Sequence, residues 1–173
     1  MTPMPPAETL TLHPGESPLL VTPLPRSEAS AGQGDTLVLC GDPVFGLCVR
    51  SLTGFASGDV LDRFSGTIGP QITQHSLQVS AGRHISGTRF VGFLSHACAP
   101  NCRLDMERFE LIALCDIAPF ELLTIDYAAT EDTLFRQFAC HCGAASCRGW
   151  ITGKLDTPGR PAGSIIPSPA SAR

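Results

Sequence analysis

Lysine is almost absent from this chain of 173 residues, because Lys154 is the only lysine among twelve lysine and arginine residues. Acidic residues outnumber basic ones, and the formal net charge is -4. A surface that binds nucleic acid is normally basic. We therefore expect no direct binding to nucleic acid.

Long apolar runs are also missing, and no stretch approaches the length of a membrane-spanning helix. Residues 1–8 lack the basic segment and apolar run of a secretory signal. We expect no membrane association, and a reducing intracellular location, cytoplasmic or, in a eukaryote, nuclear.

The 43% hydrophobic content is enough for one core in a chain of about one domain. Residues 1–35 are rich in Pro, Ser, Gly and Ala without a sustained apolar period, which predicts a disordered or extended leader. Residues 19–21 could add a strand at the edge of the core. Residues 154–173 predict a flexible tail.

Between these tails, short β-rich runs alternate with glycines, which predicts a mostly β domain. Long helical periodicity is missing, although residues 131–137 could form one or two helical turns. The expected strands lie within residues 36–40, 47–50, 60–68, 76–79, 109–114 and 122–125.

Eight cysteines are many for this length. In a secreted protein an even number would suggest disulfides. In a reducing compartment clustered cysteines more often bind metal, so zinc is favoured over disulfides. Cys140, Cys142 and Cys147 offer three thiolates in a C-x-C-x4-C pattern, and Cys98 can supply a fourth.

Three segments occur in a telling order: SHACAPNC at 95–102, ELLTIDY at 121–127 and CHCGAASCRG at 140–149. Together they resemble the catalytic core of SET-domain protein lysine methyltransferases with a post-SET zinc segment. The resemblance implies a SET fold of several short sheets with a C-terminal pseudoknot. It places the SET domain at residues 36–133 and the post-SET zinc segment at 134–153.

The resemblance implies that S-adenosylmethionine is the cofactor, and it assigns cofactor contacts to five residues, Phe45, Gly46, Ser95, His96 and Phe138. Four positions depart from the family pattern. Val44 replaces a glycine, Gly92 an arginine, Ser95 an asparagine and Ala97 a serine.

Tyr127, the only tyrosine, matches the catalytic tyrosine of the family. A free lysine, with a pKa of about 10.4, is protonated at neutral pH, so the site must favour the neutral amine and align it with the methyl group. Ile125 stands where the family uses Phe or Tyr to tune the number of methyl groups. Because it has no hydroxyl, we expect a site that permits di- or trimethylation.

The resemblance also makes Cys98 the fourth ligand of a structural zinc ion with Cys140, Cys142 and Cys147, and leaves His141 as a competing ligand. The other four cysteines are expected to pack as small buried hydrophobes. These are Cys40, Cys48, Cys102 and Cys115.

Two other interpretations remain beside the enzyme. The chain could be a catalytically degenerate SET fold that binds a peptide or protein, or a zinc-stabilised interaction module. For the enzyme, the expected partner is a lysine-containing protein or peptide, with histones among the candidates. Family members dock such substrates as an added strand.

Overall fold

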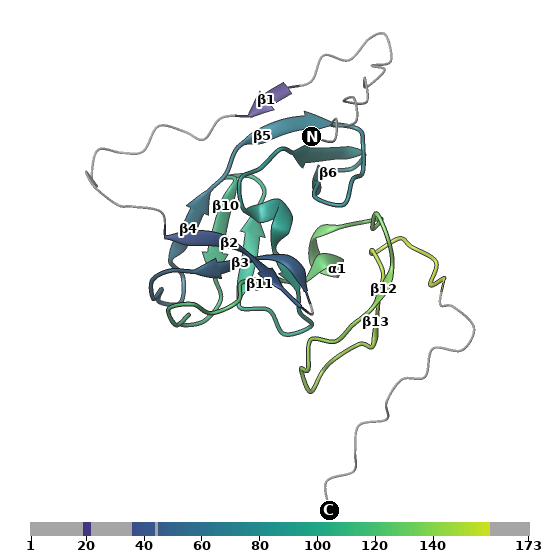
Figure 1. Ribbon diagram of the computed structural model, residues 1–173. Helices are drawn as coiled ribbons and strands as arrows, with labels where there is room; N and C mark the ends of the chain where they lie inside the picture. The colour runs from purple at the N-terminus through teal and green to yellow at the C-terminus, as the bar shows by residue number, and fades with distance from the viewer. Residues whose placement is uncertain (1–18, 22–35, 44, 160–173) are drawn as a thin grey trace, which may run out of the picture.

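Short strands from distant parts of the sequence make up most of the protein in the computed structural model (Figure 1). The structure describes residues 19–21, 36–43 and 45–159, and of 19–21 it describes only the backbone. The predictions for the rest of the leader, for Val44 and for residues 160–173 lie outside the described residues. The mostly β prediction is confirmed.

The strands fall into small sheets. One has the order β1-β5-β7-β6 and another the order β4-β10-β9. The remaining strands pair in twos, as β2-β3, β8-β11 and β12-β13. Their bounds are β1 Leu19–Val21, β2 Leu37–Asp42, β3 Gly46–Ser51, β4 Val60–Arg63, β5 Gly66–Gly69, β6 Leu77–Ser80, β7 Arg83–Ser86, β8 Ser95–His96, β9 Cys102–Asp105, β10 Glu110–Ala113, β11 Thr124–Ile125, β12 Phe138–Ala139 and β13 Trp150–Ile151.

The expected edge strand is confirmed, since β1 pairs antiparallel with β5 at the end of its sheet. The expected strand at 60–68 is two strands, β4 and β5, and they belong to different sheets. Strand β7, whose His84 and Ile85 are both buried, was missed by the sequence analysis although it lies in the centre of the four-stranded sheet.

The expected helical turns at 131–137 are wrong. The helix is α1, Tyr127–Thr130, and η1, Val91–Phe93, is a short 3-10 helix. Side chains hold the backbone of the 131–137 segment instead. The Asp132 amide donates to Gln78 Oε1 at 2.7 Å and the Leu134 amide to Asp156 Oδ2 at 3.1 Å. These long-range bonds replace the helical ladder.

One apolar core joins the sheets. It includes Val49, Ile85, Leu111, Leu123 and Ile125, each of which is buried. The parallel pairing of β8 with β11 brings the segment around residue 96 against the segment around residue 125, as the predicted pseudoknot requires. Strands β12 and β13 form a separate flap beside α1 (Figure 1). No helix in the described part of the chain is long and apolar enough to cross a membrane.

Candidate functional site

A cavity of about 290 Å³ opens where the β2-β3 hairpin, η1 with β8, α1 and the β12 flap meet. Five of the six residues predicted as catalytic or cofactor-binding line it, namely Phe45, Ser95, His96, Tyr127 and Phe138. Two of the predicted metal ligands, Cys140 and Cys142, also line it. Gly46 does not line it. Gly46 instead begins β3 with a φ of 72°, a conformation that glycine adopts without steric cost, and so it turns the chain after Phe45.

Three aromatic rings form the wall next to α1. The centroids of His96 and Tyr127 lie 5.3 Å apart, those of Tyr127 and Phe138 5.9 Å, and those of His96 and Phe138 5.8 Å. All three pairs meet edge to face, the arrangement that ring quadrupoles favour. Residues from β8, α1 and β12 therefore converge on one apolar surface.

The Tyr127 hydroxyl is held by the backbone. It donates to the Leu94 carbonyl oxygen at 2.6 Å, and the Tyr127 amide donates to His96 Nδ1 at 3.3 Å. Burial raises the pKa of Tyr127 to about 12. The hydroxyl is therefore neutral at physiological pH, and it can orient a substrate without serving as a base.

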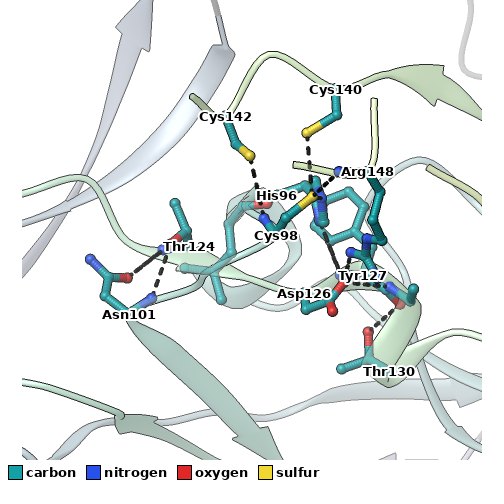
Figure 2. Close-up of polar contacts among 12 residues, drawn as sticks. His96, Cys98, Asn101, Thr124, Asp126, Tyr127, Thr130, Cys140, Cys142 and Arg148 are labelled. Atoms are coloured by element: carbon teal, nitrogen blue, oxygen red, sulfur yellow. Dashed lines mark hydrogen bonds and ion pairs between the residues drawn. The ribbon is translucent and has the colours of Figure 1, made fainter. Parts of the chain in front are cut away.

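Asn101 joins the two segments that cross beneath the cavity. Its Oδ1 accepts from the Thr124 amide at 2.8 Å (Figure 2). Its Nδ2 donates to the Leu122 carbonyl oxygen at 2.8 Å. The Ala97 amide adds a bond to the Ile125 carbonyl oxygen at 3.0 Å. These bonds fix β8 against β11, and so they position His96 beside Tyr127.

Gly92, which replaces an arginine of the family pattern, lies against a neighbouring backbone. A Cβ atom at this position would come within 2.4 Å of the His75 carbonyl oxygen. His75 Nδ1 lies 3.0 Å from the Gly92 carbonyl oxygen, and its ring lies against the Phe93 ring at a tilt of 34°, with centroids 4.5 Å apart. His75 lines the cavity. The backbone of His75 therefore occupies the space where a side chain at position 92 would begin. His75 was not predicted from the sequence as a site residue.

The four predicted metal ligands come together. The Sγ atoms of Cys98, Cys140, Cys142 and Cys147 all lie within 4.8 Å of one another. A tetrahedral zinc ion with Zn–S bonds of about 2.3 Å places its sulfur atoms about 3.8 Å apart. The observed distance between the Sγ atoms of Cys98 and Cys140 is 3.8 Å. The exposed His141 is outside this group.

Backbone amides support the sulfur atoms. The Cys98 amide donates to Cys142 Sγ at 3.5 Å, and the Arg148 amide donates to Cys98 Sγ at 3.4 Å (Figure 2). Such bonds orient thiolate ligands and offset their charge. Four thiolates leave no open coordination position, so this cluster can bind zinc as a closed structural site.

An ion pair connects the cysteine cluster to the tyrosine. The Arg148 guanidinium pairs with Asp126 Oδ1, and Asp126 also accepts from the Ala128 amide at 3.0 Å as the N-cap of α1 (Figure 2). The hydrogen bond from the Arg148 guanidinium to Asp126 raises the pKa of Arg148. Neither residue was predicted as a site residue, although Arg148 belongs to the quoted C-R-G motif.

Other lining residues were also missed, among them Leu47, Phe93, Glu131 and Phe135. Among the lining residues that the structure describes, Glu131 is the only carboxylate, and it is buried. Both of its oxygens accept from the Gln78 amide, at 3.0 and 3.2 Å, and burial raises its pKa. No motif signalled it, because its role depends on a strand 53 residues away.

The four cysteines that were expected to pack have different outcomes. Cys48 and Cys102 are buried, as expected, and Cys40 is only partly buried. Cys115 is exposed, and the expectation that it packs is wrong. It follows Leu114, whose amide bonds to the Asn101 carbonyl oxygen at the end of β10. There the chain leaves the sheet, so no neighbouring strand covers the side chain.

Ile125 is 1% exposed, belongs to the hydrophobic core and does not line the cavity. Its side chain therefore packs in the core, and the number of methyl groups transferred stays a prediction.

Comparisons with known proteins agree with these motifs. A methyltransferase of Aspergillus flavus, flvH, is 29% identical over 122 residues, which cover 69% of this chain and 68% of that protein. The histone H3 lysine-9-specific N-methyltransferase of Schizosaccharomyces pombe is 33% identical over 86 residues, which cover 35% of this chain and only 17% of that protein.

Among solved structures, KRYPTONITE in complex with mCHG DNA and SAH matches with a TM-score of 0.53 and 26% identity. The match covers 66% of this chain and 28% of that one. A second KRYPTONITE structure, with mCHH DNA, an H3(1-15) peptide and SAH, matches at 25% identity and the same TM-score of 0.53. The SET domain family matches residues 23–128, and the chain belongs to this family.

Proposed function

We propose that this protein transfers methyl groups from S-adenosylmethionine to the ε-amine of lysine in a protein or peptide. The observation that carries the proposal is the position of Tyr127. Its neutral hydroxyl is fixed to Leu94 at the wall of a cavity that His96 and Phe138 also line. The relatives of this chain that are named as methyltransferases support the reaction class.

The cavity suits the cofactor. Its aromatic wall offers edges and faces to the adenosyl group, and η1 with β8 lies along one side. Phe45, Ser95, His96 and Phe138 would hold the cofactor from three different elements, with Gly46 setting the turn beside Phe45. When bound, the cofactor supplies an electrophilic methyl group on a positive sulfur.

The substrate amine must arrive without its proton, which passes to water before the transfer. Among the described residues that line the cavity, Glu131 is the only carboxylate, and both of its oxygens accept from the Gln78 amide. Burial in this cavity disfavours the charged form of an amine and therefore favours the neutral amine. The Tyr127 hydroxyl then orients the amine. The N–C bond forms as the C–S bond breaks.

Zinc would act only structurally, held by Cys98, Cys140, Cys142 and Cys147. Its site joins the β12 flap to the segment that follows β8, and therefore keeps Phe138 next to His96. We further propose a reducing compartment, where these thiols persist. Histone substrates remain candidates, because two relatives that are named as histone H3 lysine-9 methyltransferases each match about a third of this chain.

The test is an assay with S-adenosylmethionine and a panel of lysine peptides, including an H3 peptide, followed by mass spectrometry. Lys154 is the only lysine, so a Lys154→Arg variant removes side-chain self-methylation and leaves the assay clean. Methylated peptide with the wild type and none with Tyr127→Phe supports the proposal. Tight SAH binding without turnover on any peptide or protein would favour the degenerate binding module.

A further inference from the structure

Two cysteines outside the metal cluster face each other across the hairpin at the mouth of the cavity. Cys40 of β2 and Cys48 of β3 are direct partners in the antiparallel register, and their Sγ atoms lie 3.3 Å apart. Both are free thiols in the structure. Neither the zinc site nor the proposed methyl transfer uses them.

The backbone geometry suits a covalent bond. Residues directly opposite in an antiparallel pair have Cα atoms about 4.5–5.5 Å apart. Disulfides span Cα distances of about 4.4–6.8 Å. The two sulfur atoms therefore need to close by little more than 1 Å, to an S–S length of about 2.05 Å, without a change of register.

The two thiols differ in access. Cys48 is 0% exposed, and burial, followed by its neighbour Cys40, raises the pKa of its thiol to about 11. Cys40 is partly exposed. An oxidant in solution therefore meets Cys40 first, while Cys48 stays protonated and protected behind it. An accessible thiol with a resolving thiol beside it is the arrangement of redox-responsive cysteine pairs.

We propose that Cys40 and Cys48 form a reversible, peroxide-sensitive disulfide that locks the β2-β3 hairpin at the mouth of the cavity. Cys40 sulfur attacks hydrogen peroxide, so an S–O bond forms, the O–O bond breaks and one water leaves. Cys48 then loses its thiol proton as its sulfur attacks the sulfenic sulfur, so the S–S bond forms, the S–O bond breaks and the hydroxyl leaves with that proton as a second water. In total, two thiols and one peroxide give one disulfide and two waters, and a thiol reductant reverses the change.

The hairpin gives the bond a consequence. Phe45 and Leu47 lie between the two cysteines in sequence, and both line the cavity. Opposed residues in a sheet hold their Cβ atoms about 4.5–5.5 Å apart, whereas a disulfide requires about 3.8 Å. Closing this gap twists the hairpin and shifts Phe45 and Leu47. We expect the oxidised protein to bind SAH several-fold more weakly, with recovery on reduction.

The first experiment treats the zinc-loaded protein with limiting hydrogen peroxide, then blocks free thiols and maps peptides by mass spectrometry. The expected result is a Cys40–Cys48 disulfide while zinc is still bound. Cys115, which is exposed, and Cys102, which is buried, are internal controls that should form no intramolecular disulfide. Peroxide that consumes the zinc thiols or Cys115 while Cys40 and Cys48 stay free would overturn the proposal.

Two variants sharpen this result. In Cys48→Ser the Cys40 sulfenic acid has no partner, so it should accumulate and be trapped by dimedone. Cys40→Ser changes the partly exposed residue and should leave Cys48 unreactive. If Cys48→Ser fails to fold, the Cys40→Ser variant and the peptide map of the wild type still test the proposal. A Cys48 that reacts with peroxide in Cys40→Ser would contradict the proposed order, in which Cys40 is oxidised first.

The second experiment measures SAH affinity by calorimetry before oxidation, after it, and after reduction. A reversible several-fold loss that is missing in Cys40→Ser supports the coupling to the cavity, and an unchanged affinity overturns that coupling. This readout rests on the proposed function, whereas the peptide map does not. Absence of SAH binding in the reduced protein would therefore count against the proposed function and not against the disulfide.

Discussion

The Tyr127 hydroxyl donates a 2.6 Å hydrogen bond to the Leu94 carbonyl oxygen, across 33 residues of sequence. This bond connects α1 to the segment between η1 and β8 and fixes the phenol at the cavity wall. A hydroxyl held in place can align a reacting amine, and alignment errors of about 1 Å can cost about 100-fold in rate.

We predict that Tyr127→Phe lowers turnover by about 100-fold or more while SAH affinity changes little. The phenyl ring keeps its edge contacts with His96 and Phe138, and only the hydroxyl is lost. Because the pKa of Tyr127 is raised to about 12, the wild-type pH profile should show no step from this residue below about pH 10. A turnover close to wild type would remove Tyr127 from the mechanism.

Gly92→Ala should destabilise the protein by about 1–3 kcal/mol, because the new Cβ would meet the His75 carbonyl oxygen. Urea unfolding of the two proteins measures the difference. The matched control is Gly41→Ala in β2, where a Cβ meets nothing within 4 Å and φ is not positive. Equal stability of Gly92→Ala and the wild type would contradict the close approach of His75.

His75→Ala tests the cavity instead of the fold. The His75 ring lies against the Phe93 ring and lines the cavity beside the position where the family has an arginine. If this segment replaces that arginine, SAH affinity should fall several-fold while the unfolding free energy changes by less than about 1 kcal/mol. Unchanged affinity would mean that His75 only fills space.

Zinc removal should loosen the β12-β13 flap and abolish cofactor binding, since Phe138 and Cys140 line the cavity. The only tryptophan, Trp150, lies on β13 and donates to Gln137 Oε1, so its fluorescence reports this change directly. Cys142→Ser should lower zinc content and cofactor affinity together. Cys115→Ser is the control and should change neither, because Cys115 is outside the cluster. A zinc-free protein with unchanged Trp150 emission would contradict this account.

Arg148→Ala removes the ion pair that links the cysteine cluster to the N-cap of α1. The two side chains are 40% and 23% exposed, so screening limits the loss of stability to about 1 kcal/mol or less. We expect a larger effect on turnover than on stability, because Asp126 positions Tyr127. Arg108→Ala, which breaks the ion pair between the more exposed Arg108 guanidinium and Asp105, should leave turnover unchanged.

The sequence predicts the residues of the site better than their arrangement. The Ser95–Cys102, Glu121–Tyr127 and Cys140–Gly149 motifs are local, and their side chains meet because β8 pairs with β11 and the four sulfur atoms cluster. The contact of His75 with Gly92 and the bonds from Gln78 to Glu131 depend on packing between distant segments. Residue spacing contains no signal for such contacts.

Cys40 and Cys48 of the β2-β3 hairpin could be predicted from the sequence only in part. Strands at 36–40 and 47–50 were expected, but Cys40 and Cys48 were predicted only to pack. Their direct pairing depends on the register, and a shift of one residue would place them on opposite faces. The glycine spacing in the sequence does not define this register.

The most direct test of the proposed function is a single-turnover reaction of excess enzyme with S-adenosylmethionine and a lysine substrate found in the screen, read by mass spectrometry. The account predicts methyl-lysine with the Lys154→Arg protein and at least about 100-fold slower formation when Tyr127→Phe is added. Equal rates for these two proteins, or methyl groups found on residues other than lysine, would contradict it.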